Sequence, residues 1–247
     1  MKQEVNIALY TVTHNQSIKN ISQNEIPIQV GAALNPQKLC KVTDDTGDNI
    51  SLKNRQYCEL TALYWIWKND NHTIIGLNHY RRKFVISLDM IQEKLFSADV
   101  IVPKPYYFRK SLEKEYARAH MSNDWIELEK ILRLRYSDEI IKHVFSSNKL
   151  YPYNMFIAQK PFVNEYCEWL FPLLFELEGK IDFRNKDAYQ SRIFGFLSER
   201  LFTLFLTLKK VSIYECSVTI PEKSNMFKSI KYAAGIWFNR LYFSIRN

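Results

Sequence analysis

The sequence predicts an α/β protein in which one layered domain occupies most of the chain. Strand-like and helix-like segments alternate along it, as they do in layered α/β folds. Its 247 residues are enough for one large α/β domain or two small ones. No internal repeat, low-complexity segment or long flexible linker divides the chain. We therefore expect one domain over residues 1–220 and an appended tail over 221–247.

The first half of the chain predicts three strands and one helix. Residues 5–12 form a short apolar run of β-favouring residues, and residues 26–32 and 73–77 are two further runs of this kind. A polar stretch rich in turn residues, 41–51, precedes a helix expected over 53–68, for which Ser51 is a suitable N-cap. Apolar side chains at three- and four-residue spacing give this helix one buried face.

The second half predicts longer helices. A short helix is expected over 88–96, followed by a strand over 98–103 that stops at Pro103. Residues 112–144 have a charged helical pattern, and residues 151–157 lead from a loop into a strand. Long helices are expected over 160–178 and 188–209, and a last strand over 212–220.

Composition narrows the classes of function. The net charge of +8 favours anionic partners, but no basic arm, zinc-finger spacing or RNA-binding aromatic pattern occurs, so we expect no nucleic-acid partner. Aromatic residues reach 15%, which suits sugar-binding clefts and membrane interfaces and also fills cores. The four cysteines are widely spaced, which fits a reducing compartment. Because we find neither a secretory signal nor an apolar run of about 18 residues, we expect a cytoplasmic protein.

Five segments share a pattern with a known family. They are D-T-G-D-N-I-S-L-K-N at 45–54, C-E-L-T-A-L-Y-W-I-W-K-N at 58–69, I-G-L-N-H-Y-R-R at 75–82, Y-N-M-F-I at 153–157 and R-I-F-G-F-L-S-E-R at 192–200. With them, the chain resembles over about residues 5–220 the bacterial family of domains of unknown function numbered 4422, found in capsule, exopolysaccharide and O-antigen gene clusters. The resemblance implies a GT-A-like, Rossmann-like single domain with a central mixed sheet flanked by helices.

The same resemblance implies a glycosyltransferase of the hexosyltransferase type. It would move a sugar, with galactofuranose as one candidate, from a UDP-linked donor to a lipid-linked glycan in surface polysaccharide biosynthesis. The usual GT-A enzyme carries an Asp-x-Asp motif that holds a divalent metal after a central strand. Here the strand 73–77 is followed by arginines, so a catalytically silent sugar-nucleotide or glycan-binding module on the same fold is the alternative.

Donor binding is expected at the carboxyl edge of the sheet, where open α/β sheets hold ligands. Arg81 and Arg82 would neutralise a diphosphate in place of a metal, because guanidinium groups suit phosphate. We therefore expect no metal ligands, with Mn²⁺ or Mg²⁺ as the alternative. These arginines could also be ordinary surface residues. The other expected donor-site residues are Thr11, Thr13, His14, Asn49, Ser51, Asn54, His79 and Tyr80.

Carboxylates and a histidine supply candidates for the base that an inverting transferase needs. His120 and Asp124 are four residues apart, so one helix would place them on one face, and Glu199 shares a helical face with Arg192. Asp182 and Asp187 are further candidates that the sequence does not separate from these. We expect Glu59 to orient Arg81 or Arg82. Asn154 is expected on a loop that touches donor or acceptor, or else as a turn residue before the next strand.

The tail predicts contact with a membrane. On a helix, apolar residues of 228–246 fall on one arc and basic residues on the other, and no acidic residue occurs there. A basic amphipathic helix lies flat in an anionic membrane interface. We therefore expect the protein at the inner face of the bacterial cell membrane, near a lipid-linked acceptor. Packing of the tail on its own domain or a partner subunit is the alternative.

Overall fold

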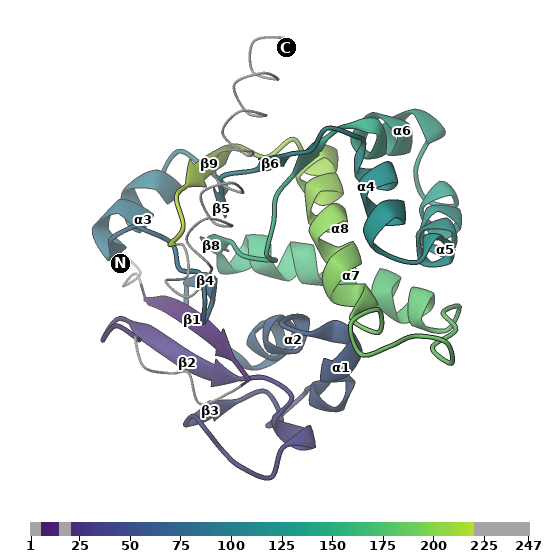
Figure 1. The fold of residues 1–247 in the computed structure, drawn as a ribbon. Coiled ribbons are helices and arrows are strands. Elements are labelled where there is room, and N and C mark those ends of the chain that lie inside the picture. The colour runs from purple at the N-terminus through teal and green to yellow at the C-terminus, as the bar shows by residue number, and fades with distance from the viewer. Residues whose placement is uncertain (1–5, 15–20, 220–247) are drawn as a thin grey trace, which may run out of the picture.

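A seven-stranded mixed sheet forms the centre of the protein, as a computed structural model describes it for residues 6–14 and 21–219 (Figure 1). The strand order is β3-β2-β1-β4-β8-β5-β9. Neighbouring strands pair in parallel except at β8, which is antiparallel to both β4 and β5. The strands are β1 Ile7–Thr13, β2 Glu25–Gln29, β3 Val42–Thr43, β4 Ile74–His79, β5 Val100–Pro103, β8 Ile157–Gln159 and β9 Ile213–Cys216. The predicted α/β fold with a mixed sheet is confirmed.

Alternating strand residues enter two different cores. Tyr10 and Ile75 belong to the larger core on one face of the sheet, whereas Leu9 and Ile74 belong to the smaller core on the other. Successive side chains of a strand point to opposite faces of the sheet. Because both faces are covered here, nearly every strand position is apolar, and the strands appear in the sequence as almost continuous apolar runs.

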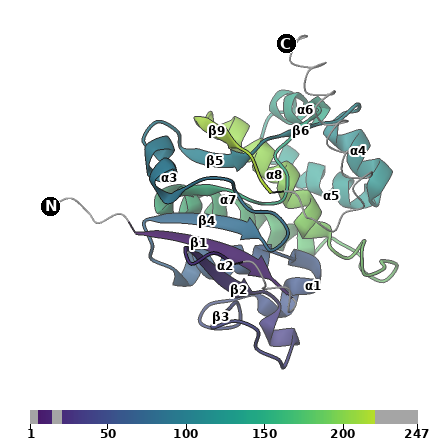
Figure 2. The same cartoon turned by 60° about the vertical axis from the view of Figure 1, so that its left-hand side comes forward.

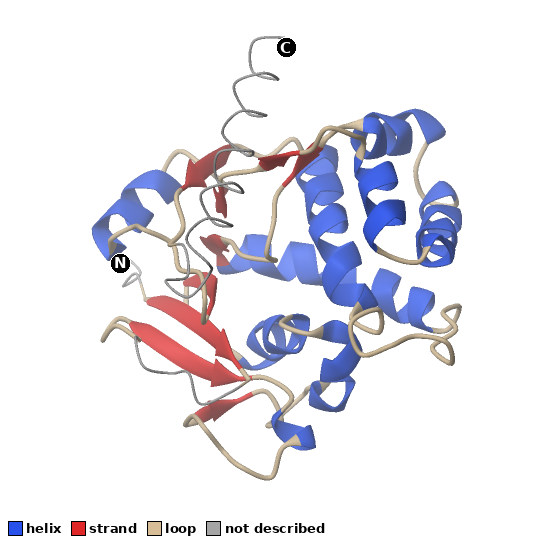
Figure 3. Cartoon of the chain, in the orientation of Figure 1, coloured by secondary structure: helices blue, strands red, loops and turns tan. Residues whose placement is uncertain are grey.

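Helices cover the two faces unequally. The larger core contains residues of α2 (Leu60–Asn69), α7 (Lys160–Glu178) and α8 (Ile193–Lys209), and the smaller contains residues of α3 (Leu88–Leu95). Figure 2 shows α2 and α7 behind the strands. The helices α4 (Leu112–Ala119), α5 (Ser122–Arg133) and α6 (Asp138–Ser146) gather beside α8, away from β2 and β3 (Figure 3). The short strands β6 (Tyr106–Tyr107) and β7 (Lys149–Leu150) pair next to them.

The helix expected over 53–68 is interrupted at Cys58. A 3₁₀ turn, Ser51–Lys53, continues into the short helix α1 (Asn54–Tyr57), and α2 begins at Leu60. Cys58 has a φ of 53°, in the left-handed region, and its carbonyl accepts a hydrogen bond from the Asn54 side chain (2.7 Å). Gly195 of α8 packs here, where an added Cβ would lie 3.1 Å from the Cys58 sulfur. This break brings the first turn of α8 close to the backbone before α2.

Other boundaries also differ from the expectations. The helical pattern over 112–144 is three helices, because the backbone is extended at His120 after α4 and at Ser137 before α6. Helix α8 begins at Ile193 instead of residue 188, after a turn at Asp187, and β9 ends at Cys216. The expected tail helix lies outside the described residues. Within those that are described, we find no helix of the length and apolar character that crossing a bilayer requires.

Candidate functional site

A pocket lies where the parallel strands end. β1 and β4 pair in register up to Val12 and His79, so their carboxyl ends meet at one edge. Because β8 is antiparallel to β4, with Ile157 opposite Gly76, the loop before β8 arrives at this edge too. The pocket has a volume of about 120 Å³. Its lining consists of Glu59, His79, Arg81, Arg82, Tyr153, Arg192, Gly195, Phe196 and Glu199.

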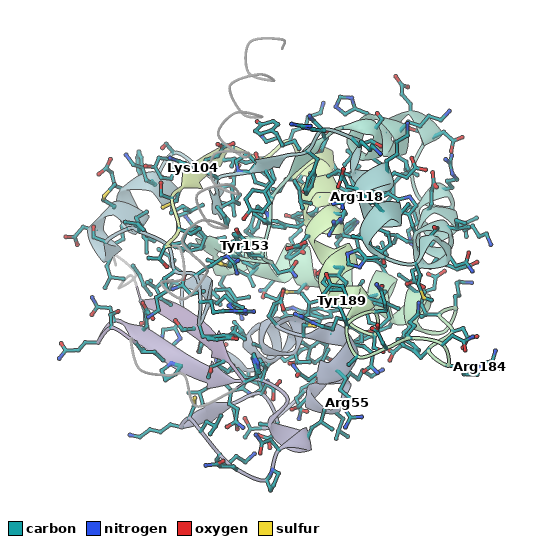
Figure 4. The ribbon with its side chains drawn as sticks, viewed as in Figure 1. Arg55, Lys104, Arg118, Tyr153, Arg184 and Tyr189 are labelled. Atoms are coloured by element: carbon teal, nitrogen blue, oxygen red, sulfur yellow. The ribbon has the colours of Figure 1, made fainter. Side chains whose placement is uncertain are left out.

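A tight turn at the end of β4 presents two guanidinium groups. The backbones of His79 and Arg82 bond to each other in both directions, at 3.0 and 2.8 Å. Arg82 lies over the ring of Tyr153, 4.3 Å from its centroid, and Arg81 lies 5.1 Å from the centroid of Tyr80. Figure 4 labels Tyr153 near the middle of the face that it shows. The turn therefore directs both arginines to the pocket while aromatic rings hold their position.

His79 is uncharged beneath these arginines. Burial, followed by the charges of Arg81 and Arg82, lowers the pKa of His79 to about 3. Its Nδ1 accepts the backbone N–H of Arg81 (3.2 Å), which leaves the proton on Nε2. His79 thus offers the pocket a neutral N–H donor at physiological pH.

Two carboxylates occupy the other side of the pocket. Glu199 accepts the backbone N–H of Tyr153 at 2.6 Å and a guanidinium N–H of Arg200 at 3.0 Å. Burial raises the pKa of Glu199, although the neighbouring Arg200 charge opposes the shift. Burial likewise raises the pKa of Glu59, and the charge of Glu199 adds to it. A carboxyl group whose pKa is raised towards physiological pH is suited to proton transfer.

Asn154 joins the elements behind the pocket. Its side chain donates to Glu59 (2.7 Å) and to the carbonyl of Gly195 (3.0 Å), and it accepts from the Ser198 hydroxyl (2.9 Å). Tyr153 and Asn154 have left-handed φ angles of 76° and 52°, and asparagine tolerates that region better than most residues. Asn154 is 3% exposed, so it positions Glu59 and does not line the pocket itself. The expectation that an arginine is the partner of Glu59 is corrected, because this hydrogen bond comes from Asn154.

Arg192 adds a third guanidinium group from the N-terminal end of α8. It is exposed, its Nε donates to the Cys58 sulfur (3.2 Å), and it lies 5.5 Å from the Phe196 centroid. The ring of His14 packs on Tyr80, with centroids 5.2 Å apart. Burial, then the charges of Arg81 and Arg192, lowers the pKa of His14, so both cations lie close enough to act on it. The edge of the sheet is therefore strongly cationic beside two carboxylates.

Sequence reasoning located much of this pocket. The structure brings together Glu59, His79, Arg81, Arg82, Arg192 and Glu199, from segments far apart in the chain. His14 and Tyr80 lie beside them.

Besides His14, Tyr80 and Asn154, a further five expected substrate-binding residues are not in the lining: Thr11, Thr13, Asn49, Ser51 and Asn54. Thr11 and Thr13 are buried in β1, and the Thr11 hydroxyl donates to Glu25 (2.7 Å). The Ser51 hydroxyl donates to buried Asp44 (2.5 Å), which also accepts two backbone N–H groups. The Asn49 amide donates to the carbonyl of Gly47, and the amide of Asn54, at the start of α1, donates to the carbonyl of Cys58. These side chains hold the loops around the sheet edge.

The expectation that His120 and Asp124 share a helical face is wrong. His120 follows the last residue of α4, and Asp124 lies in the first turn of α5, because the chain turns between them. Asp124 forms a buried ion pair with Lys186, at 2.9 Å, and lines a different cavity. His120 stacks on Phe196, with centroids 4.1 Å apart, behind the wall of the pocket.

Three lining residues were not expected: Tyr153, Gly195 and Phe196. A signal for Phe196 was present, because it lies between Arg192 and Glu199 at helical spacing and so shares their face. Tyr153 precedes Asn154 in the Y-N-M-F-I segment, but only the antiparallel direction of β8 brings it to the pocket.

The described residues do not suit a divalent metal of the GT-A kind. β4 is followed by Tyr80, Arg81 and Arg82 instead of an acid pair. Residues 6–14 and 21–219 contain no group of three or more His, Cys, Asp or Glu side chains placed to hold a metal ion. The nearest cations to a bound diphosphate would be arginines of the chain itself. Metal independence stays a prediction.

Comparisons with known proteins agree with this geometry. A solved structure titled as the apo form of WbbM, a bifunctional glycosyltransferase, is similar to this chain with a TM-score of 0.79 and 29% sequence identity. The similarity covers 90% of this chain and 46% of that one, so the chain spans about half the length of WbbM. It supports glycosyl transfer as the general chemistry. No curated protein matches the chain.

A family model gives the classification. The model described as a domain of unknown function, DUF4422, matches residues 8–210, which include every residue of the pocket lining. The match covers most of the chain and begins and ends inside the described fold. The chain therefore belongs to the DUF4422 family.

Proposed function

We propose that the protein is a glycosyltransferase of the hexosyltransferase type that uses a nucleoside-diphosphate sugar, with a UDP-linked galactofuranose as the candidate donor. One observation carries the proposal. Three guanidinium groups and two carboxylates with raised pKa values line a single pocket at the carboxyl edge of the parallel strands. Cations there suit a diphosphate, and the carboxylates suit removal of a proton from an acceptor hydroxyl.

The arginines would stabilise the leaving group. In an inverting transfer, the bond between the anomeric carbon and the phosphate oxygen breaks, and its electron pair goes to the nucleoside diphosphate. In this proposal that charge develops beside Arg81, Arg82 and Arg192, which line the pocket and supply fixed cations to stabilise it. The neutral imidazole of His79 can donate its Nε2 proton in a hydrogen bond to a phosphate or sugar oxygen.

Glu199 is the base in this proposal. It would take the proton of the acceptor hydroxyl as the acceptor oxygen forms its bond to the anomeric carbon. Hydrogen bonds from Tyr153 and Arg200 fix the carboxylate and leave it further lone pairs for the substrate. Glu59 is the second carboxylate of the pocket. Because it accepts a hydrogen bond from Asn154, the proposal gives it the role of holding the loop before β8 in place. Neither His120 nor Asp124 lines the pocket, and neither carries a step in this proposal.

The acceptor and the location of the protein follow as further parts of the proposal. We expect a lipid-linked glycan acceptor in surface polysaccharide biosynthesis, and a protein on the cytoplasmic side that contacts anionic membrane through residues 228–246. The basic, acid-free composition of that segment supports this expectation. Cutting the chain after Pro221 should leave a folded, donor-binding protein that no longer sediments with anionic liposomes. The membrane contact would be contradicted if the truncated protein still sedimented with the liposomes, or if the intact protein did not.

Donor binding tests the proposal directly. A thermal-shift panel of sugar nucleotides should raise the melting temperature of the wild type, because a ligand that binds the native state stabilises it. Arg81→Ala and Arg82→Ala should each weaken binding by at least about 1.5–3 kcal/mol, the size of a lost charge-assisted contact. Arg184→Ala is the matched control, because Arg184 is exposed and pairs only locally with Asp182. Unchanged donor affinity in both pocket variants would refute the assignment.

A further inference from the structure

The wall of the pocket continues outward into a cluster of aromatic rings. Phe196, which lines the pocket, stacks on His120 with centroids 4.1 Å apart and planes 26° apart. Tyr189 lies 5.1 Å from Phe196 and 5.9 Å from His120. We call these three residues the aromatic rim. Tyr189 is its outermost member and is 52% exposed, and Figure 4 shows it on the same face as Tyr153.

The loop that carries Tyr189 is held by its own hydrogen bonds. Asp187 accepts from the backbone N–H of Gln190 (2.7 Å) and, through its carbonyl, from the Ser191 hydroxyl (2.8 Å). The Gln190 side chain donates to the carbonyl of Ala119 at the end of α4 (3.2 Å). The exposed ring is therefore fixed before any ligand binds, and a fixed aromatic side chain loses little conformational entropy on binding.

Folding alone does not explain this exposed ring at the mouth of the pocket. A tyrosine ring at a surface offers a large apolar face and a polar hydroxyl, a combination that is common in binding sites. The neighbouring His120 adds an uncharged ring, because burial and then the Arg200 charge lower the pKa of His120 to about 4. Phe196 is one helical turn from both Arg192 and Glu199, and the Arg192 guanidinium lies 5.5 Å from its ring centroid, so the aromatic rim borders the side of the pocket that α8 forms.

We propose that the aromatic rim is the acceptor subsite and that a sugar ring of the acceptor glycan stacks on Tyr189. This inference rests on the proposed function. One face of a sugar ring consists of C–H groups, which the negative face of an aromatic ring attracts, while the hydroxyl groups at its edge stay hydrated or bind polar groups. A saccharide stacked on Tyr189 would extend over Phe196 and place its terminal hydroxyl next to Glu199. The acceptor would then enter over the aromatic rim, beside Arg192 of the donor site.

Binding of simple saccharides tests the aromatic rim without knowledge of the natural acceptor. The probes are methyl glycosides of galactose, glucose, rhamnose and N-acetylglucosamine, which carry no apolar chain, measured by saturation-transfer NMR in the presence of UDP. The wild type should bind at least one of them. Tyr189→Ala should weaken that binding at least fivefold, whereas Tyr189→Phe keeps the ring and should stay within twofold. Phe96→Ala is the control, because Phe96 is 95% exposed beside α3 and does not line the pocket.

The outcomes separate this inference from the proposed function. UDP affinity should be equal in all variants, because Tyr189 does not line the pocket of the arginines. If the wild type binds UDP but no glycoside, or if Tyr189→Ala binds glycosides as the wild type does, the acceptor subsite is wrong and the donor site stands. If glycoside binding depends on Tyr189 while UDP does not bind, the saccharide subsite stands and the transferase proposal fails.

Discussion

Asn154 is the residue whose replacement should reveal most about how the pocket is built. Its side chain makes three hydrogen bonds, to Glu59, Gly195 and Ser198, and its backbone is left-handed with a φ of 52°. We predict that Asn154→Ala destabilises the protein by about 4.5–6 kcal/mol. A bond to a charged group contributes about 1.5–3 kcal/mol, each neutral bond about 1 kcal/mol, and the left-handed backbone costs alanine about 1 kcal/mol more.

Two further replacements separate these contributions. Asn154→Gly removes the same hydrogen bonds but adopts the left-handed backbone freely, so it should be about 1 kcal/mol less destabilised than the alanine variant. Asn154→Asp keeps the shape of the side chain and can still accept from Ser198, but it places a second carboxylate against Glu59. Two adjacent carboxylates cannot both ionise without cost, so the folded-state pKa of the pair rises above its unfolded value.

The aspartate variant therefore has a signed pH dependence. A raised folded-state pKa stabilises the protein at pH below the ordinary carboxyl value of about 4, and this stability is lost as the pH rises. The gap in unfolding free energy between wild type and Asn154→Asp should widen from pH 5 to pH 8. Urea unfolding followed by tryptophan fluorescence at both values measures it. A gap that is constant with pH would show that Glu59 is not the ionised partner of Asn154, and the described network would be wrong.

Three other predictions concern the chemistry of the pocket and its surroundings. Glu199→Gln should lower kcat by about 10²–10⁴-fold and retain donor affinity, and a variant of normal rate would exclude Glu199 as the base. Because burial raises the pKa of Glu199, kcat/KM of the wild type should already decrease at a pH above the ordinary pKa of a carboxyl group. Activity should persist in excess EDTA, and loss that Mn²⁺ restores would reveal a metal site. Because the pKa values of His79 and His120 are lowered to about 3 and 4, the stability from the neutral rings is present above about pH 6.5 and is lost as the pH falls towards those values, by about 1 kcal/mol per pH unit for each. His79→Asn combined with His120→Phe should flatten that loss in denaturation at pH 7 and pH 5, and an equally steep loss would contradict both assignments.

Local patterns in the sequence predict the layered fold and many of the residues that line the pocket. Apolar runs with β-favouring residues predict the strands, because a strand buried on both faces needs apolar side chains at every position. The polar residues of 78–82 directly follow such a run, which predicts that the strand ends there, and β4 ends at His79. Arg192 and Glu199 share a helical face at seven-residue spacing, and both line the pocket. These are local patterns, and each depends on the period of one element.

Which side chains of different elements lie next to one another depends on how those elements pack, and local patterns do not encode it. The antiparallel direction of β8 brings Tyr153 and Asn154 to the pocket, and no pattern within a single strand encodes its direction. Asn154 and Glu59 are 95 residues apart in the chain, and they meet because Gly195 lets α8 pack against the break at Cys58. His120 and Asp124 have a spacing that would place them on one helical face. They do not share a face, because α4 ends before His120 and α5 begins at Ser122. Local periodicity follows from backbone geometry, whereas the partners of a buried polar side chain follow from how distant elements pack around it.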